Sequence, residues 1–222
     1  MTDVRSRRID IGTVVAVVGE NGSGKSSLLH CLCGLLRPAE GSVHGVGSLS
    51  AAFQDHARLE LRAWESIGVG DVARAGERYA VIAALARAAA AELVDELPFG
   101  LDTQLGAAWS GGVDLSGGQW QQVAVGRAMM RAPRLMVLDE PTASLDPLTE
   151  HNLFRRFASI DRSALGGGVL VLASHRFAGV ADADEILVMD GGRLVDRGRH
   201  ADLIARGGLY ARLYELQAQT FR

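Results

Sequence analysis

Continuous apolar runs of strand length alternate along the chain with longer stretches of helical periodicity. Four runs are apolar at every position: 14–18, 135–138, 169–173 and 186–189. A strand that is apolar on both faces is typical of a parallel sheet buried between helices. Helical periodicity, together with the prolines that end it, predicts helices over 26–36, 71–97 and 119–131. The alternation predicts an α/β fold with a largely parallel sheet covered on both faces.

The middle of the chain differs from its two flanks. Helical signals dominate between 55 and 134, where no strong strand signal occurs, whereas 41–53 has short apolar pieces between glycines, typical of one or two strands. We therefore expect one domain over 1–222, with a core made from 1–54 and 135–222 and an inserted helical subdomain over 55–134. At 222 residues the chain is long enough to bury a substantial core.

Composition and charge narrow the function classes. The formal net charge of −3 gives no reason to expect a nucleic-acid backbone as a partner. The most apolar stretch, 80–91, is interrupted by Arg87 and is shorter than the roughly 18–20 residues of a membrane span. Cys31 and Cys33 lie two positions apart on a predicted helix, so they should point to different faces as buried, unpaired apolar residues. We therefore expect a soluble protein.

The run GENGSGKS over 19–26 ends the first predicted strand and opens the first predicted helix. Glycines let such a loop close around a phosphate, whose oxygens then accept hydrogen bonds from backbone amides and the helix N-terminus. In this G-x-x-x-x-G-K-S pattern Lys25 reaches the β- and γ-phosphates, and the Ser26 hydroxyl ligates Mg²⁺. The alternative is a glycine turn that only joins strand and helix. The candidate nucleotide ligands are Gly19, Glu20, Asn21, Gly22, Ser23, Gly24, Lys25, Ser26 and Ser27.

Two acidic residues follow the strand predicted over 135–138. At the end of an apolar strand the Asp139 carboxylate can hold Mg²⁺ directly or through water, and Glu140 can polarise an attacking water as a general base. The alternative is a pair of acids that caps a following helix. The apolar residues before the pair and Pro141 after it favour the catalytic interpretation.

The segment LSGGQ over 115–119 carries a resemblance to a known family. Together with the phosphate loop and the Asp139–Glu140 pair, in this order, it resembles the nucleotide-binding domain of ATP-binding cassette (ABC) transporters, over nearly the whole chain. The resemblance implies a P-loop NTPase core with ATP and Mg²⁺ as cofactors. It also implies residues that act in trans, on the ATP held by an opposite protomer: Ser116, Gly117, Gly118, Gln119 and, from the D-loop, Asp146.

Two single residues gain a role from the same resemblance. Gln54 lies where the family has its Q-loop, which contacts Mg²⁺, and His175 lies where it has the switch histidine, which contacts the γ-phosphate. Taken alone, Gln54 is typical of a surface polar residue and His175 of a loop histidine with satisfied hydrogen bonds. The implied catalytic residues are Glu140, His175 and Lys25, and the implied Mg²⁺ ligands are Ser26, Gln54 and Asp139.

Segments outside the motifs resemble exporters in particular. They are 53–67, 97–106 and the tail 198–214. The resemblance therefore implies an ATPase that powers an ABC exporter, as a homodimer or as a heterodimer with another ABC ATPase domain, and with a transmembrane permease domain or subunit as partner. It implies a cytoplasmic location, peripheral on the inner face of the cell membrane. No nucleic acid is expected as a partner.

Departures from the family pattern leave alternatives open. The family stacks adenine on an aromatic residue upstream of the glycine loop, but only 18 residues precede Gly19 and no Phe, Trp or Tyr occurs before Phe53. We therefore expect an incomplete N-terminal antiparallel β-subdomain, with either a true start upstream or a truncated cassette of impaired turnover. Gln122 stands where a basic residue is frequent. A soluble ABC ATPase without a transport role is the remaining alternative.

Overall fold

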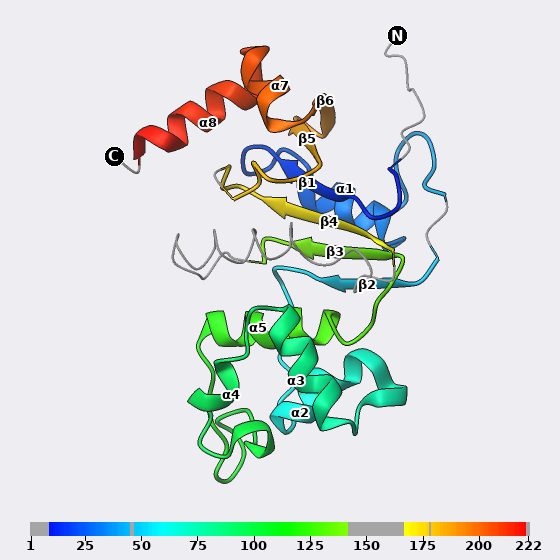
Figure 1. The fold of residues 1–222 in the computed structure, drawn as a ribbon. Coiled ribbons are helices and arrows are strands. Elements are labelled where there is room, and N and C mark those ends of the chain that lie inside the picture. The colour runs from blue at the N-terminus through cyan, green and yellow to red at the C-terminus, as the bar shows by residue number, and fades with distance from the viewer. Residues whose placement is uncertain (1–8, 45–46, 142–166, 178, 221–222) are drawn as a thin grey trace.

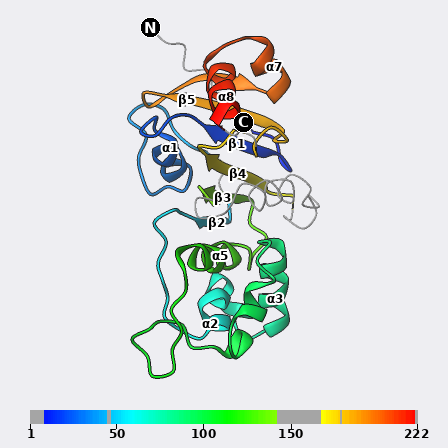
Figure 2. The ribbon, with the colours of Figure 1, turned by 90° about the vertical axis from the view of Figure 1, so that its left-hand side faces the viewer.

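A six-stranded sheet lies at the centre of the molecule, between a group of helices at one edge and the C-terminal helices at the other (Figure 1). The computed structural model describes residues 9–44, 47–141, 167–177 and 179–220. Figure 2 shows the same stacking of helices, sheet and helices from a second direction. The predicted fold class, an α/β fold with a mostly parallel sheet, is confirmed.

The strands pair in the order β2-β3-β4-β1-β5-β6, and all neighbours are parallel except β5 and β6. The four predicted strands are present as β1, β3, β4 and β5, and the described part of 41–53 contains one strand, β2. Strand β6 was not predicted, because only two of its residues, Leu194 and Val195, are apolar and half of the strand is exposed. The strands are β1 Val14–Val18, β2 Leu49–Ala52, β3 Leu135–Asp139, β4 Val169–Ser174, β5 Glu185–Asp190 and β6 Arg193–Gly198.

The parallel register aligns the carboxyl ends of three strands. Val17 of β1 lies opposite Ala173 of β4, and Ala173 lies opposite Asp139 of β3. The segments that follow these positions therefore leave the sheet at one edge, on the left in Figure 1. In a parallel α/β sheet this carboxyl edge is where ligands bind.

Helices cover the sheet and fill the segment between β2 and β3. Each of the described helices is too short or too polar to cross a bilayer. The α-helices are α1 Lys25–Leu32, α2 Ala63–Gly68, α3 Arg78–Arg87, α4 Leu93–Glu96, α5 Gly117–Ala128, α7 His200–Ala205 and α8 Leu209–Thr220, and 3₁₀ helices span Val69–Arg74 and Gly100–Asp102. The predicted helix 119–131 is thus α5, which begins two residues earlier and ends three earlier.

Helix α1 ends at Leu32, four residues before the predicted end. Gly34 adopts a left-handed φ of 71°, and the amide of Leu35 donates to the carbonyl oxygen of His30 at 2.9 Å. This is the Schellman motif, in which a residue of positive φ turns the chain away from the helix axis. The predicted end at 36, taken from the following proline, was therefore wrong.

The alanine-rich stretch 71–97, predicted as one helix, is divided into separate helices. Its longest helix, α3, ends at Arg87 with a second Schellman motif, in which Ala89 has a φ of 52° and the amide of Ala90 donates to the carbonyl oxygen of Leu85 at 2.9 Å. Alanine rarely adopts a positive φ, so nothing in the sequence marks the end of α3. The predicted helical stretch is therefore interrupted here, as it is also between the 3₁₀ helix Val69–Arg74 and α3.

The two faces of the sheet pack against different elements. Because side chains alternate along a strand, Val15 and Val17 of β1 enter one buried cluster with Leu29 of α1, while Ala16 and Val18 enter the other. The second cluster continues into the helices between β2 and β3 and into α7 and α8. Burial on both faces explains the continuous apolar runs. The domain boundaries drawn at 54/55 and 134/135 stay a prediction.

Candidate nucleotide site

The loop between β1 and α1 folds back over its own lysine. The amino group of Lys25 is buried, and it donates hydrogen bonds to the carbonyl oxygens of Gly19, at 2.9 Å, and Glu20, at 3.2 Å. Gly22 and Gly24 have φ values of 80° and 98°, which L side chains rarely adopt. The loop therefore surrounds a buried cation with backbone, an arrangement that suits a phosphate.

The turn between β5 and β6 supports this loop from outside. The amide of Gly192 donates to the carbonyl oxygen of Ser23 at 2.9 Å, and a Cβ atom at Gly24 would lie 3.0 Å from Gly192 Cα. A Cβ atom at Gly19 would lie 2.4 Å from the carbonyl oxygen of Met189. Packing therefore excludes a side chain at position 19, and at position 24 the tight contact adds to a left-handed φ that already favours glycine.

Helix α1 begins with backbone donors beside the loop. Its N-cap residue, Gly24, offers no side-chain cap, and its first turn contains no acidic residue. The first amides of a helix have no partner within the helix, so those of Lys25, Ser26 and Ser27 are available to an anion. The helix dipole adds to the attraction.

Asp139, the last residue of β3, presents a buried carboxylate with one unpartnered oxygen. It is 4% exposed, and its Oδ1 atom has no hydrogen-bond partner. Burial raises the pKa of this carboxyl group, against the opposing effect of a hydrogen bond from the Ser26 side chain. A cation would satisfy Oδ1 and offset the cost of burying charge. Mg²⁺ prefers oxygen ligands and one or two carboxylates, so Asp139 and Ser26 fit this ion.

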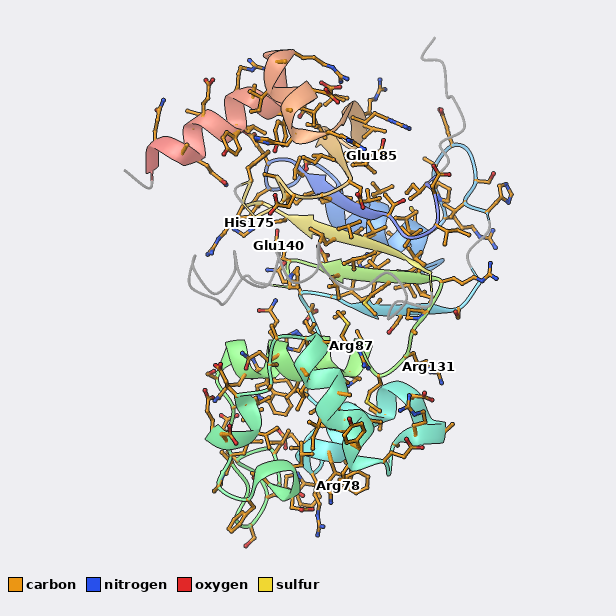
Figure 3. The ribbon with its side chains drawn as sticks, viewed as in Figure 1. Arg78, Arg87, Arg131, Glu140, His175 and Glu185 are labelled. Atoms are coloured by element: carbon orange, nitrogen blue, oxygen red, sulfur yellow. The ribbon has the colours of Figure 1, made fainter. Side chains whose placement is uncertain are left out.

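Glu140 and His175 meet at the carboxyl edge of the sheet (Figure 3). The Oε1 atom of Glu140 lies 3.2 Å from Nδ1 of His175. Glu140 has a left-handed φ of 48°, unusual for a residue other than glycine and typical of strained functional positions. Its amide donates to the carbonyl oxygen of Ala173 at 3.0 Å, and its carbonyl accepts from Nε2 of Gln121 at 2.5 Å. These contacts hold the strained backbone that places the carboxylate beside the histidine.

Three other candidate residues are exposed at the same edge. Ala52 of β2 pairs with Leu138 of β3, so Gln54, which follows β2, leaves the sheet beside the acidic pair that follows β3. Glu20 and Asn21 are exposed on the phosphate loop. All three are positioned to meet a ligand that binds along the carboxyl edge.

The LSGGQ segment opens helix α5. Ser116 is its N-cap: the Ser116 hydroxyl accepts from the amide of Gln119 at 3.2 Å, and Oε1 of Gln119 accepts from the amide of Ser116 at 2.9 Å. The side-chain nitrogen Nε2 of Gln119 donates to Oε2 of Glu96 at 2.8 Å. Ser116 and Gly117 are exposed, with Gly118 half-buried. The hydroxyl proton and the first amides of α5 therefore remain free for an outside acceptor.

Figure 2 shows α5 nearly end-on, from the side toward which the carboxyl edge of the sheet also points. The LSGGQ segment and the phosphate loop thus occupy one side of the molecule, but on separate parts of it. The phosphate loop, Asp139, Glu140 and His175 form one group, with Gln54 beside it. Asp146 lies outside the described residues.

Two residues that contact this group were missed by the sequence analysis. Gln121 binds the backbone of Glu140, and Gln217 of α8 binds the backbone of His175. Both partners are carbonyl oxygens, which every residue has, so no residue pattern marks the contact. Cys31 and Cys33 are free, as expected, but half-buried rather than buried, because the helix that carries them ends there.

Comparison with known proteins places this chain in a family. The sequence profile of the family described as ABC transporter matches residues 4–143. The chain is 37% identical to the "Cyclolysin secretion/processing ATP-binding protein CyaB" of Bordetella pertussis, over 96% of this chain and 30% of that protein. It is 39% identical to an "ATP-dependent lipid A-core flippase" of Pseudomonas putida, over 92% of this chain and 35% of that protein.

A solved structure shows the same likeness in three dimensions. The "Structure of a bacterial Atm1-family ABC exporter with ATP bound" superposes with a TM-score of 0.79 at 33% identity, over 94% of this chain and 37% of that chain. The chain therefore spans about a third of the length of the relatives it matches. On the phosphate loop, the LSGGQ segment, the family match and the shared fold, the chain belongs to the ABC transporter family.

Proposed function

We propose that this chain hydrolyses Mg-ATP and that Glu140 and His175 form the centre of the site. The observation that carries the proposal is the 3.2 Å contact between these two side chains, at the ends of adjacent strands and on the same sheet edge as the phosphate loop. A carboxylate oriented by a histidine beside a cradle for phosphate is an arrangement that suits attack of water on a phosphoryl group.

The chemistry follows from the roles of the named groups. Water attacks the γ-phosphorus in line, Glu140 accepts its proton, and the bond between the γ-phosphorus and the β–γ bridging oxygen breaks to leave ADP and phosphate. Lys25 and the amides at the start of α1 stabilise the negative charge that develops on the phosphate oxygens, and His175 contacts the γ-phosphate. Mg²⁺, held by Ser26 and Asp139 with Gln54 beside them, supplies charge neutralisation when bound.

The LSGGQ segment supports a site shared between two chains. Its donors are exposed on a part of the molecule separate from the phosphate loop, so they are suited to the nucleotide of an opposite protomer. Head-to-tail pairing of two copies, or of this chain with a related ATPase domain, would bring Ser116–Gln119 and the D-loop residue Asp146 to each phosphate loop.

Transport is the proposed use of the hydrolysis. The names of the relatives describe secretion and lipid flipping, and the solved neighbour is described as an exporter. We propose a permease as partner, with the chain on the inner face of the membrane as the energy-supplying unit. Closure and reopening of the ATPase pair would then drive the permease between two orientations.

The test measures Mg-ATP turnover of the 222-residue chain and of two variants with the same chemical change. Glu140→Gln should abolish turnover, whereas Glu215→Gln, an exposed glutamate on α8, should leave it unchanged. Equal rates for the wild type and Glu140→Gln would refute hydrolysis at this site.

A mixing experiment tests the shared site. Glu140→Gln and Ser116→Arg chains should each be inactive alone, because every site in their dimers lacks either the base or the in-trans donor. A mixed dimer contains one site with both groups intact, so an equal mixture should recover roughly a quarter of wild-type turnover. No recovery on mixing, with both variants folded, would contradict in-trans action of Ser116.

A further inference from the structure

The C-terminal helix α8 forms hydrogen bonds to the backbone of the segment that carries His175. The side-chain amide of Gln217 accepts a hydrogen bond from the amide of Phe177 at 2.8 Å and donates one to the carbonyl oxygen of His175. One side chain thus binds the backbone on both sides of Arg176. The side-chain amide supplies the acceptor and the donor on two separate atoms of one planar group, whereas a carboxylate only accepts and an ammonium only donates.

Packing anchors the same segment to α8 at a second point. The ring of Phe177 is buried, and its centroid lies 5.5 Å from that of Tyr210, also buried. Tyr210 is fixed in turn, because its hydroxyl lies 2.8 Å from Nδ1 of His200 on α7. The position of residues 175–177 is therefore coupled to the docking of α8.

This contact borders the candidate nucleotide site. A cleft of about 300 Å³ is lined by Glu20 and Asn21 of the phosphate loop, by Gln217 of α8 and by His175. The two residues of the proposed catalytic pair are thus held from different helices. Gln121 of α5 binds the carbonyl of Glu140, and Gln217 of α8 binds the carbonyl of His175.

We infer that Gln217 is a positioning residue for hydrolysis, which fixes His175 in register with Glu140. The inference rests on the proposed function, because it needs a reaction at this pair. Gln217 holds the backbone of residue 175 while the imidazole reaches Glu140 across 3.2 Å. Without the two Gln217 hydrogen bonds the backbone of His175 is free to move, and the imidazole ring loses its fixed distance to the Glu140 carboxylate and to the γ-phosphate. The loss falls on the rate of the chemical step, and binding of ATP through the phosphate loop is retained.

Three substitutions distinguish the effect of the two Gln217 hydrogen bonds from any effect on the stability of α8. Gln217→Leu removes both hydrogen bonds, and Gln217→Glu keeps the acceptor for Phe177 but removes the donor for His175. Gln219→Leu makes the same change as the first variant at an exposed glutamine of the same helix. Each is measured in the 222-residue chain, with thermal unfolding to establish that it is folded.

Turnover gives the first readout. Since a displacement of about 1 Å can cost up to ~10²-fold in rate, we expect Gln217→Leu to lower kcat about tenfold with KM within about twofold of wild type. Gln217→Glu should lower kcat as well, and Gln219→Leu should not. In a His175→Ala background Gln217→Leu should have no further effect, because Gln217 acts through His175.

Hydrogen exchange gives a readout that does not depend on turnover. The Phe177 amide, which donates to Gln217, should exchange faster in Gln217→Leu than in wild type or Gln219→Leu. Unchanged exchange at Phe177, an unchanged kcat in Gln217→Leu, or an equal loss in the His175→Ala background would each overturn the inference while leaving hydrolysis intact. Equal turnover of wild type and Glu140→Gln would instead refute the proposed function, and the positioning role with it.

Discussion

Alanine substitution at two glycines of the phosphate loop separates steric contact from backbone conformation. Gly19 and Gly22 both have a positive φ, of 153° and 80°. A Cβ atom at Gly22 would have no heavy atom within 4 Å, whereas one at Gly19 would lie 2.4 Å from the carbonyl oxygen of Met189 and 2.6 Å from the hydroxyl oxygen of Ser23. The same change of one methyl group therefore meets open space at one position and a strand backbone at the other.

The expected losses of free energy of unfolding differ because only the Cβ atom at position 19 meets a close neighbour. A residue with a side chain at a positive φ costs about 1–2 kcal/mol, which is the whole expected loss of stability for Gly22→Ala. Overpacking adds about 1–3 kcal/mol at Gly19. Met189 belongs to β5, which pairs with the central strand β1, so its carbonyl cannot move away without disturbing the sheet. We expect Gly19→Ala to lower the free energy of unfolding by about 2–5 kcal/mol in total.

The assay is urea unfolding of both variants, followed by far-ultraviolet circular dichroism. Tryptophan fluorescence is less suitable, because the chain's three tryptophans, Trp64, Trp109 and Trp120, all lie between β2 and β3 and report on that region. Loss of stability in Gly22→Ala equal to or greater than that in Gly19→Ala would refute the steric argument. So would a loss below about 1 kcal/mol in Gly19→Ala, since the backbone cost alone reaches that value.

Three further predictions follow from single groups. Burial raises the pKa of the Asp139 carboxyl, so the ligand-free chain should lose stability as the pH rises from near the ordinary value of 3.8 through the raised value. Asp139→Asn should remove this loss of stability with pH and raise the unfolding temperature of the ligand-free chain at pH 7. It should also abolish the rise in unfolding temperature that Mg-ATP causes in the wild type, and an unchanged rise would contradict the prediction. Burial raises the pKa of Cys33 to about 11, so in a Cys31→Ala chain roughly 0.1% of the thiol is ionised at pH 8, and alkylation measured by mass spectrometry should accelerate about tenfold per pH unit up to pH 10. Ser116→Ala should lower the free energy of unfolding by about 1 kcal/mol in urea titrations through loss of the N-cap, with Ser116→Asn restoring most of it; equal losses in both would argue against capping.

The fold was predictable where burial leaves a continuous apolar run. The four buried strands are recognisable as continuous apolar runs because both faces of each are covered. Prolines and glycines mark most of the turns. The misses have local causes. Ala89 ends α3 in a conformation that alanine rarely adopts, so an alanine-rich segment conceals its own break. Strand β6 lies at the edge of the sheet, where polar residues are accommodated.

The arrangement of the candidate site was predictable where a motif follows a strand. The phosphate loop, Asp139, Glu140 and His175 lie at the carboxyl edge because each is at or just after the end of a parallel strand, and the strand register brings Glu140 to His175. The helices that hold this pair were not predictable. Gln121 and Gln217 bind backbone carbonyls from 19 and 42 residues away, and only the folded arrangement shows which glutamines do so.

The sheet order also sets when the phosphate loop becomes functional during synthesis. Among the described strands β1 comes first in sequence, yet it lies between β4 and β5, which begin only at Val169 and Glu185. At ribosomal speed the run VVAVV therefore waits on the order of 10 s without its native partners. Such long-range parallel pairing folds slowly and exposes an apolar strand to aggregation. The strand that carries the phosphate loop is thus synthesised well before the two strands that bury it, so the nascent chain has no complete nucleotide site until β4 and β5 have also been made.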